Sequence, residues 1–316
     1  MNDIAVVGAG AWGTALAIQA ARAGRSVALW ARHPGRLEAG ENPRLPGLRL
    51  PGAVRVTGDL PTAPLVLLAV PVQHMRAVAA LLPPGGPLVV CAKGVESLTR
   101  RLPLEVLAEL QPGRPAAVLT GPNFAHEVAA GLPAATVAAS SDPAVRTAVA
   151  ESLGTPCFRI YGNDDPVGAQ VGGAAKNVVA IAAGAVIGAG LGENARAALV
   201  TRGLAELARL AVALGGRADT VAGLSGLGDL MLTCAGAGSR NFSLGLALGR
   251  GERLEDVLGR RDAVTEGVTT APALVARAAE MGADLPICSA VADVVTGKLT
   301  LAQAMELLLS RPRKDE

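Results

Sequence analysis

The stretch from Ile4 to Ala17 constrains the fold of this chain more than any other. It reads as an apolar run, then Gly-x-Gly-x-x-Gly at Gly8, Gly10 and Gly13, then a helix-forming run. In this motif the first glycine allows a tight turn out of a strand, the second lets a pyrophosphate approach the backbone, and the third lets the helix pack closely. Because a strand precedes the motif and a helix follows it, the stretch predicts a dinucleotide-binding strand-turn-helix unit.

The end of the second predicted strand bears on which dinucleotide is bound. The helix after the glycines starts at Ala11 or Trp12 and points its amides at the phosphates. Residues 26–30 form the next strand, and Arg32 and His33 follow it where an acidic residue would hold the ribose hydroxyls of NAD. Arginine suits a 2′-phosphate, so the sequence favours NADP over NAD. The alternative is a surface arginine without this role.

Strand and helix patterns divide the chain into two halves. Apolar strands are predicted at residues 65–70, 88–92, 117–120, 135–138 and 156–160, and residues 42–58 are predicted to form a loop. Helices are predicted at residues 166–188, 194–214, 241–248, 269–281, 289–295 and 301–309, and around Asp229. The predicted fold class is therefore α/β, with an N-terminal Rossmann-type doubly wound sheet in residues 1–165 and a C-terminal all-helical domain in residues 166–316.

Composition limits the function classes. The formal net charge of +2 gives no strong attraction to nucleic acid or anionic membranes. The four cysteines lie far apart without metal-type spacing, so we expect a reducing compartment and no bound metal. The uncharged run Val178–Leu191 is shorter than the ~20 residues that span a bilayer. We therefore expect a cytoplasmic protein without an integral membrane segment.

The candidate chemistry rests on lysine. Among 29 basic residues only four are lysine, and Lys93 and Lys176 alone lie outside the polar C-terminal surroundings. Lys176 lies near the start of the most apolar helix, where desolvation lowers a lysine pKa from about 10.4. Such a lysine can take an alcohol proton while a hydride leaves the same carbon. The alternative is a lysine whose ammonium snorkels to the surface at a helix end.

Two further segments place polar groups in the helical half. Asp229 follows a glycine-rich turn at a helix start, where it could pair with a buried lysine or act as an ordinary N-cap. Ser239 is a natural cap, and Arg240 beside free helix amides makes an anion site suited to a substrate phosphate. The alternative for this pair is a capped surface helix with an arginine facing solvent.

Over essentially its full length, the chain resembles bacterial NAD(P)-dependent glycerol-3-phosphate dehydrogenases. The segments that carry the resemblance are GAGAWGTALA, LPG at Leu45, VPVQ at Val70, KG at Lys93, GPNFAHEVAAGLPAA from Gly121, GGAAKNVVAIAAG from Gly172, GLSGLGDLMLTC from Gly223, SRN at Ser239 and TEGV at Thr265. The resemblance implies interconversion of sn-glycerol 3-phosphate and dihydroxyacetone phosphate with NADP or NAD, a supply of glycerol 3-phosphate for phospholipid synthesis, and a homodimer.

The resemblance also implies roles for single residues, with Lys176 as the proton acceptor, Lys93 touching substrate and cofactor, and Asp229 positioning the reacting end. The implied substrate contacts are Lys93, Gly121, Asn123, Lys176, Asp229, Ser239, Arg240 and Asn241. The implied cofactor contacts are Gly8, Gly10, Ala11, Trp12, Gly13, Arg32, His33, Lys93, Ala125, Arg240, Val264 and Glu266. The chain departs from the family at Asn123, commonly Ser or Thr, and at Arg44, usually apolar or aromatic.

Three alternatives stay open at this point. His126, on a loop at the ligand edge of the predicted sheet, is the best alternative acid/base because many dehydrogenases use histidine. A second reading is a two-domain dehydrogenase for a β-hydroxyacid or an acyl-CoA. A third is a nucleotide sensor without turnover, which would gain nothing from a desolvated lysine.

Overall fold

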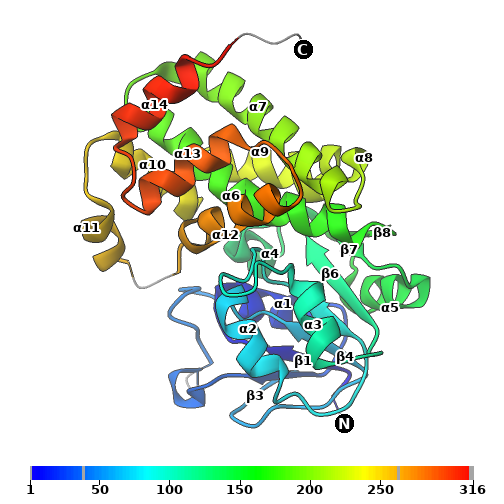
Figure 1. Ribbon diagram of the computed structural model, residues 1–316. Coiled ribbons are helices and arrows are strands. Elements are labelled where there is room, and N and C mark those ends of the chain that lie inside the picture. Colours follow the sequence, from blue (N-terminus) through cyan, green and yellow to red (C-terminus); the bar gives the residue numbers. More distant parts are fainter. Residues whose placement is uncertain (1, 38–39, 262–263, 313–316) are drawn as a thin grey trace. The chain divides into compact units, whose positions relative to one another are not determined.

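The chain forms two compact units in a computed structural model, which describes residues 2–37, 40–261 and 264–312 (Figure 1). Unit 1 comprises Met1–Lys93 and Leu102–Gln170, and unit 2 comprises Gly94–Arg101 and Val171–Glu316. The change of unit at residue 170 falls inside one continuous helix, so no separate linker joins the units there.

Within the described residues of unit 1, eight strands form one sheet in the order β3-β2-β1-β4-β5-β6-β7-β8. The strands are β1 Ile4–Val7, β2 Val27–Trp30, β3 Val54–Thr57, β4 Leu65–Leu68, β5 Leu88–Val90, β6 Ala116–Thr120, β7 Ala134–Ala139 and β8 Phe158–Asn163. Neighbouring strands are parallel except β6 and β7, which are antiparallel. The prediction of a largely parallel, doubly wound sheet is confirmed.

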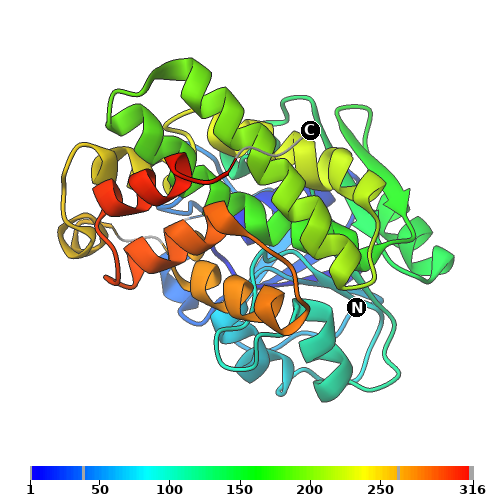
Figure 2. The same cartoon turned by 45° about the horizontal axis from the view of Figure 1, so that its top comes forward.

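The helices of unit 1 lie on both faces of this sheet (Figure 1, Figure 2). They are α1 Ala11–Arg22, the 3₁₀ turn Pro34–Leu37, α2 Val72–Ala79, α3 Pro103–Leu110, α4 Ala125–Ala130 and α5 Pro143–Leu153. Helix α1 packs with α4 and α5, whereas α2 packs with α3. The chain winds outward from β1 in both directions, and right-handed crossovers then place α1 on one face and α2 and α3 on the other.

Strand β3 corrects the prediction that residues 42–58 form a loop. Its four residues, Val54 to Thr57, pair in parallel with β2 at the edge of the sheet. The segment is short, contains Arg55, and lies among prolines and glycines. Its alternation of apolar and polar residues is therefore too short to predict a strand among so many turn-forming residues. An edge strand tolerates this composition because one of its sides pairs with no other strand.

Unit 2 is helical in its described residues from Val171 onward, as predicted for the second half of the chain. Its helices are α6 Pro166–Gly188, α7 Gly192–Ala213, α8 Ala218–Ala222, α9 Asp229–Cys234, α10 Arg240–Gly249, α11 Leu254–Gly259, α12 Glu266–Glu280, α13 Pro286–Val295 and α14 Leu301–Leu309, with a π turn at Leu224–Gly228. The sequence prediction missed α8 and α11, which have only five and six residues and so little periodicity.

Helix α6 is the central helix of unit 2. It is longer than the uncharged run Val178–Leu191, and by length and composition its 23 residues could cross a membrane. However, 89% of its most apolar window is buried inside the protein. The predicted helix at residues 166–188 and its burial are confirmed, and α6 is packed as a core helix is.

Candidate functional site

The glycine turn between β1 and α1 has the geometry that a dinucleotide needs. Gly8 has φ +117°, and a Cβ there would lie 2.9 Å from the backbone of Ala69 on the neighbouring segment. A Cβ on Gly13 would lie 1.8 Å from the carbonyl oxygen of Gly8, so only glycine lets α1 pack this close. At Gly10 the space is open, and the nearest atom to a built Cβ is Nη1 of Arg44 at 3.7 Å. The backbone is therefore accessible where a pyrophosphate would approach.

The first turn of α1 supplies donors beside this opening. Gly10 is the N-cap, and the first bond across the turn runs from the amide of Thr14 to the carbonyl of Gly10 at 2.9 Å. The amides of Ala11 and Trp12 precede it and lack partners within the helix. Arg32 and His33 follow β2 with exposed side chains that make no hydrogen bond or ion pair to other described residues. Both are available to an external anion.

Lys93 and Gly121 meet at the carboxyl edge of the sheet. Lys93 follows β5 and Gly121 follows the adjacent parallel strand β6. The half-buried Lys93 ammonium donates a hydrogen bond to the carbonyl of Gly121 at 3.0 Å. Gly121 has φ +152°, and a Cβ there would lie 3.0 Å from Cα of Thr136. Lys93 and Gly121, two of the three predicted substrate contacts of unit 1, are thus brought together at the edge where such sheets bind ligands.

The amide of Asn123 is only half satisfied. Its Nδ2 donates to the carbonyl of Ala135 at 3.2 Å, which fixes which end of the amide is oxygen. Its Oδ1 is buried and has no hydrogen-bond partner among the described residues, and the same holds for Oγ1 of Thr120. A buried acceptor without a partner is costly, so a donor from a ligand is the natural complement.

His126 is a poor match for a shielded acid/base. It lies in the first turn of α4, stacks on Phe124 with ring centroids 5.7 Å apart, and has a side chain that is 65% exposed. Its Nε2 lies 3.8 Å from the carboxylate of Glu127. Ala125 begins the same helix, whose left-handed end falls at Gly131. The imidazole is therefore largely exposed, and among the described residues no buried side chain forms a hydrogen bond that would orient it.

Lys176 and Asp229 form a buried ion pair in unit 2. The Lys176 ammonium donates to Oδ1 of Asp229 at 2.5 Å and to Oγ1 of Thr233 at 2.8 Å. The two charged side chains are 10% and 1% exposed. Thr233 in turn donates to the carbonyl of Asp229 at 2.6 Å, one helical turn back in α9. The predicted pairing of Asp229 with a buried lysine is confirmed, and Thr233 is a partner that the sequence analysis missed.

Close helix packing brings the two charges together. Gly172 and Lys176 are four residues apart and so lie on the same face of α6. A Cβ on Gly172 would lie 2.6 Å from the carbonyl of Ser225, in the π turn that precedes Asp229. A Cβ on Gly226 would lie 2.0 Å from the carbonyl of Val221. Glycine at both positions lets the turn approach α6, and Asp229 then begins α9 beside the lysine.

Asn241 links three helices next to this pair. Its Nδ2 donates to Oδ1 of Asn177 at 2.9 Å, and its Oδ1 accepts from the amide of Gly267 at 3.0 Å. Asn177 is the neighbour of Lys176 on α6, and Gly267 lies in the first turn of α12. Because both ends of the amide are used, Asn241 holds the start of α10 against the lysine helix. Sequence reasoning missed Asn177 and Gly267, although one adjoins Lys176 and the other adjoins Glu266.

The N-terminus of α10 gathers positive charge. Ser239 is its N-cap and accepts from the amide of Phe242 at 3.2 Å, as predicted. The exposed Arg240 side chain makes no hydrogen bond or ion pair to other described residues. Arg261 donates to the carbonyl of Arg240 at 2.7 Å. Burial lowers the pKa of Arg261, and Arg240 adds to the effect as a like charge. Two guanidinium groups beside a helix N-terminus favour a bound anion.

Two further predicted cofactor contacts, Val264 and Glu266, lie at or just before the start of α12, and two buried cysteines lie near the lysines. Val264 is 47% exposed, and Glu266 is the first residue of α12. Burial raises the pKa of the Cys234 thiol to about 12, although the nearby Lys176 charge opposes this. Burial likewise raises the pKa of Cys91, against the charge of Lys93. Both thiols therefore stay protonated. No group of three His, Cys, Asp or Glu that could hold a metal lies among the described residues.

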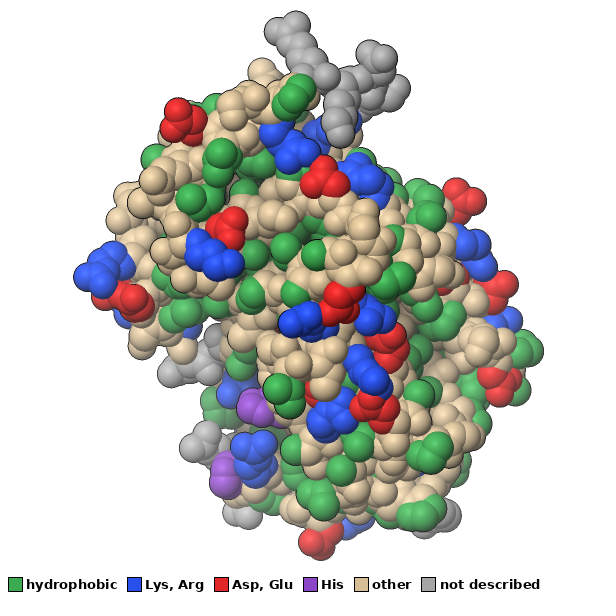
Figure 3. Space-filling model, in the orientation of Figure 1, with side chains coloured by type: hydrophobic (Ala, Val, Ile, Leu, Met, Phe, Trp, Pro, Cys, Tyr) green, Lys and Arg blue, Asp and Glu red, His purple; other side chains and the backbone are tan. Residues whose placement is uncertain are grey.

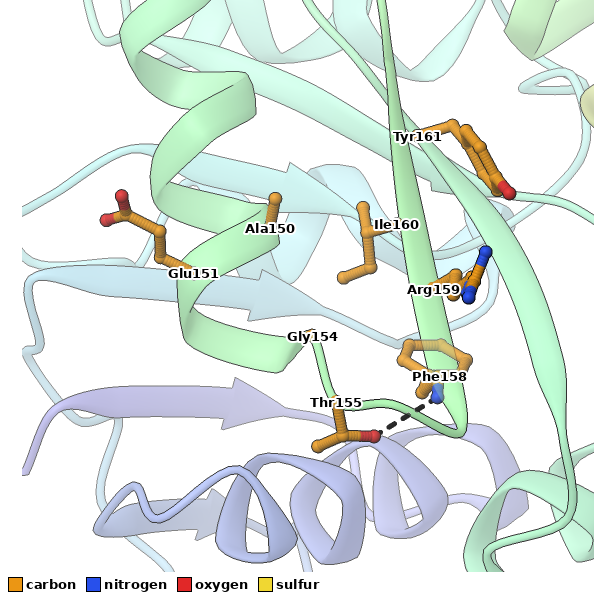
Figure 4. A pocket seen from close by; sticks show the side chains of 8 residues that line it. All are labelled: Ala150, Glu151, Gly154, Thr155, Phe158, Arg159, Ile160 and Tyr161. Carbon is orange, nitrogen blue, oxygen red and sulfur yellow. Dashed lines mark hydrogen bonds between the residues drawn. The ribbon is translucent and has the colours of Figure 1, made fainter.

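A hollow on unit 1 lies apart from the predicted site residues (Figure 4). It has a volume of about 440 Å³ and is lined by residues of α5, of β8 and of the segment between them: Ala150, Glu151, Gly154, Thr155, Phe158, Arg159, Ile160 and Tyr161. None of these side chains was predicted to touch substrate or cofactor. On the molecular face in Figure 3, acidic and basic side chains are interspersed instead of gathered by sign, in keeping with the net charge of +2.

Comparisons with known proteins agree along the whole chain. Residues 3–146 match the N-terminal family model of NAD-dependent glycerol-3-phosphate dehydrogenase, and residues 165–306 match the C-terminal one. A glycerol-3-phosphate dehydrogenase [NAD(P)+] from Acidiphilium cryptum is 57% identical over 99% of this chain and 98% of its own length. The enzyme of the same name from Gluconobacter oxydans is 54% identical over 98% and 97%.

A solved structure extends the likeness to three dimensions. The crystal structure of glycerol-3-phosphate dehydrogenase from Coxiella burnetii is similar with a TM-score of 0.94 and 37% identity, covering 98% of this chain and 99% of that one. Sequence, family models and fold thus point to one group of proteins. The chain belongs to the NAD-dependent glycerol-3-phosphate dehydrogenase family.

Proposed function

We propose that this protein interconverts sn-glycerol 3-phosphate and dihydroxyacetone phosphate by hydride transfer with NADP or NAD. The observation that carries the proposal is the buried Lys176–Asp229 pair, in a chain of this family. A binding protein would gain nothing from an ion pair that is costly to bury. A dehydrogenase needs one group that takes and returns a proton in a shielded place.

Lys176 is proposed as that group. Oxidation of the alcohol removes a hydride from C2 and a proton from its oxygen, and the neutral amine of Lys176 accepts the proton. In the reverse direction the ammonium returns it to the carbonyl oxygen. Burial favours the neutral amine and the Asp229 carboxylate favours the ammonium, so the pair supports exchange in both directions. Thr233 holds Nζ in position at 2.8 Å.

Polar groups in each unit are proposed as contacts for the substrate. Lys93 offers a positive charge, and Oδ1 of Asn123 offers an acceptor that suits the primary hydroxyl present in both substrates. Ser239 and Arg240 at the start of α10 are proposed to hold the phosphate, and Asn241 is proposed to touch the substrate while fixing this helix. Gly121 supplies backbone at the same edge as Lys93.

The residues of the glycine turn fit a dinucleotide, because Gly10 has no Cβ that would project into the space where the pyrophosphate would approach the backbone. A nicotinamide cofactor held there would supply the acceptor or donor of the hydride at C2. We propose NADP as the favoured cofactor because the cationic Arg32 and the neighbouring His33 are exposed where an NAD site would have an acid. The remaining proposed contacts are Gly8, Ala11, Trp12, Gly13, Lys93, Ala125, Arg240, Val264 and Glu266.

The test is a substrate assay on the purified protein. Dihydroxyacetone phosphate is mixed with NADPH or NADH, and oxidation of the nicotinamide is followed by absorbance. We expect turnover with both cofactors and a higher kcat/KM with NADPH. Turnover of a β-hydroxyacid or an acyl-CoA instead, or tight cofactor binding with no turnover of any of these substrates, would overturn the proposal.

The proposal extends to the setting of the enzyme. We propose two domains, residues 1–165 for the dinucleotide and residues 166–316 for substrate and catalysis, in a cytoplasmic homodimer that supplies glycerol 3-phosphate for phospholipid synthesis. The free cysteines Cys91, Cys157, Cys234 and Cys288 support a reducing compartment. Light scattering on the purified protein tests the dimer. Loss of phospholipid synthesis on depletion, restored by added glycerol 3-phosphate, tests the supply role.

A further inference from the structure

Arg44 is a cation that lies over the glycine turn of unit 1. Its Nη1 is 3.7 Å from the position of a Cβ built on Gly10, and among the described residues, apart from the chain neighbours of Gly10, no other atom lies within 4 Å of that position. The Arg44 side chain is exposed and makes no hydrogen bond or ion pair to residues 2–37, 40–261 or 264–312. A charge that has no partner among the described residues and lies beside the open face of Gly10 suggests a partner from outside the chain.

The loop that carries Arg44 is fixed to the glycine turn. Nδ2 of Asn42 donates to the carbonyl of Ala9 at 3.1 Å and to Oγ1 of Thr14 at 2.6 Å, so this amide ties the loop to both sides of Gly10. Oδ1 of Asn42 accepts from the backbone amide of Arg44 at 2.9 Å. The next residue, Leu45, is 2% exposed and packs on α1. The position of Arg44 on the loop is therefore set by Asn42 and Leu45, and not by a contact of the Arg44 guanidinium with the described residues.

We propose that Arg44 binds the pyrophosphate of the dinucleotide from the side opposite the α1 amides. The amides at the start of α1 already favour an anion beside Gly10, and the guanidinium adds charged donors that match phosphate oxygens. This inference rests on the proposed function, because it assumes a dinucleotide at the glycine turn. Arg44 and Arg32 are therefore expected to differ in how they affect the binding of the two cofactors. The pyrophosphate is common to NAD and NADP, so Arg44 acts on both equally, whereas Arg32 is proposed to read only the 2′-phosphate.

The test measures Kd for NADPH and for NADH by fluorescence titration in wild type, Arg44→Gln and Arg49→Gln. Arg49 is the matched control on the same loop, because its side chain is 84% exposed and pairs with Glu41 at 3.3 Å. We expect Arg44→Gln to raise both Kd values about tenfold, within the range for a charge-assisted hydrogen bond, without changing their ratio. Arg49→Gln should change neither. Arg44→Lys, which keeps the charge, should recover part of the loss.

The outcomes separate this inference from the function on which it rests. Unchanged Kd values in a folded Arg44→Gln overturn the role of Arg44 while leaving the dehydrogenase proposal intact. A loss confined to NADPH would place the 2′-phosphate at Arg44 and also overturn the inference. If wild type binds neither cofactor, the proposed function itself fails. Equal thermal unfolding midpoints of the variants exclude a folding defect as the cause of any loss.

Discussion

The glycine turn of unit 1 and the lysine cluster of unit 2 are built in opposite ways. The turn is made of backbone: Gly8, Gly10 and Gly13 lie within six residues of one another, and what matters is the absence of side chains. The cluster is made of side chains from α6 and α9, and Lys176 and Asp229 are 53 positions apart in the sequence. One region is open, and the other is buried.

This difference corresponds to the two proposed roles, which are cofactor binding at the glycine turn and proton transfer at the lysine cluster. An open backbone turn offers amide donors to an anion, and no charged side chain has to be buried to do so. A proton-transfer group must be shielded and oriented, and the charged pair proposed for this role is packed between helices. Changes in the turn should therefore act on folding or cofactor affinity, and changes in the cluster on turnover or on the stability of a buried charge.

The largest expected effect concerns the turn. In Gly13→Ala the new Cβ would lie 1.8 Å from the carbonyl oxygen of Gly8, so we expect a loss of at least about 4 kcal/mol in the free energy of unfolding. In Gly10→Ala the nearest atom would be 3.7 Å away, so the fold should persist while Kd for NADPH rises at least about tenfold. Thermal unfolding and cofactor titration measure the two effects. A well-folded Gly13→Ala that binds NADPH normally would contradict the packing described here.

The next effect concerns the cluster. Asp229→Asn keeps the shape of the side chain but leaves the Lys176 ammonium buried without its counter-charge, and we expect unfolding to become easier by about 3–5 kcal/mol. Urea denaturation gives this value. The double variant Lys176→Met with Asp229→Asn removes the unpaired charge and should recover part of the loss. If the double variant is no more stable than Asp229→Asn alone, the two groups are not coupled as the structure implies.

A third, smaller effect is pH-dependent. Glu206 is a buried carboxylate that accepts from the amides of Ile287 and Cys288 at the start of α13. Burial raises its pKa above the ordinary 4.5, although these hydrogen bonds oppose the shift. Between the unfolded and the raised folded pKa, the native state binds more protons than the unfolded state, so this group makes the protein less stable as pH rises through that window.

Two variants of Glu206 separate its charge from its capping role. Glu206→Gln still accepts a hydrogen bond but has no charge, so its stability relative to wild type should improve as pH rises from about 4.5. Glu206→Ala loses the cap as well as the charge, so it should be less stable than Glu206→Gln by about 2 kcal/mol at every pH. Denaturation curves at several pH values check both. A constant difference between wild type and Glu206→Gln across pH would contradict a raised pKa.

The smallest effect tests cofactor preference. Arg32→Ser should raise the Kd of NADPH about tenfold, because one charge-assisted contact to the 2′-phosphate is lost, and should leave the Kd of NADH unchanged. Arg25→Ser is unsuitable as a control because Arg25 donates to the carbonyl of Glu151. Arg253→Ser is suitable, since that side chain is 74% exposed and, among the described residues, pairs only with the surface carboxylate of Glu255. Equal losses for both cofactors would place Arg32 elsewhere on the dinucleotide.

Features fixed by local backbone constraints could be predicted from sequence. The glycine turn, the buried strands and helix α6 are of this kind, because one residue type or one apolar run decides each of them. The pairing of Asp229 with a buried lysine was also foreseen, from a carboxylate among apolar residues and the scarcity of lysine. The antiparallel pairing of β6 with β7 could not be predicted, because the sequence of an apolar strand does not indicate whether it runs parallel or antiparallel to its neighbour.

Partners fixed only by tertiary packing were missed. Thr233 is one helical turn after Asp229, and that spacing was a usable signal. Asn177 and Gly267 meet Asn241 only because three helices converge, which no local pattern reveals. Gly172 is likewise an ordinary helical glycine until the π turn is seen against it. The catalytic and binding roles of all these residues stay predictions that experiments must test.

The most direct test of the central proposal compares kcat of Lys176→Ala and His126→Ala, with Lys298→Ala as a control whose exposed ammonium pairs with Asp293. Reduction of dihydroxyacetone phosphate by NADPH is measured at saturation, together with Kd for NADPH. We predict that Lys176→Ala lowers kcat about 100- to 10,000-fold while cofactor affinity persists, and that His126→Ala and Lys298→Ala stay near wild type. Retained turnover in Lys176→Ala, with its loss in His126→Ala, would contradict the assignment of proton transfer to the buried pair.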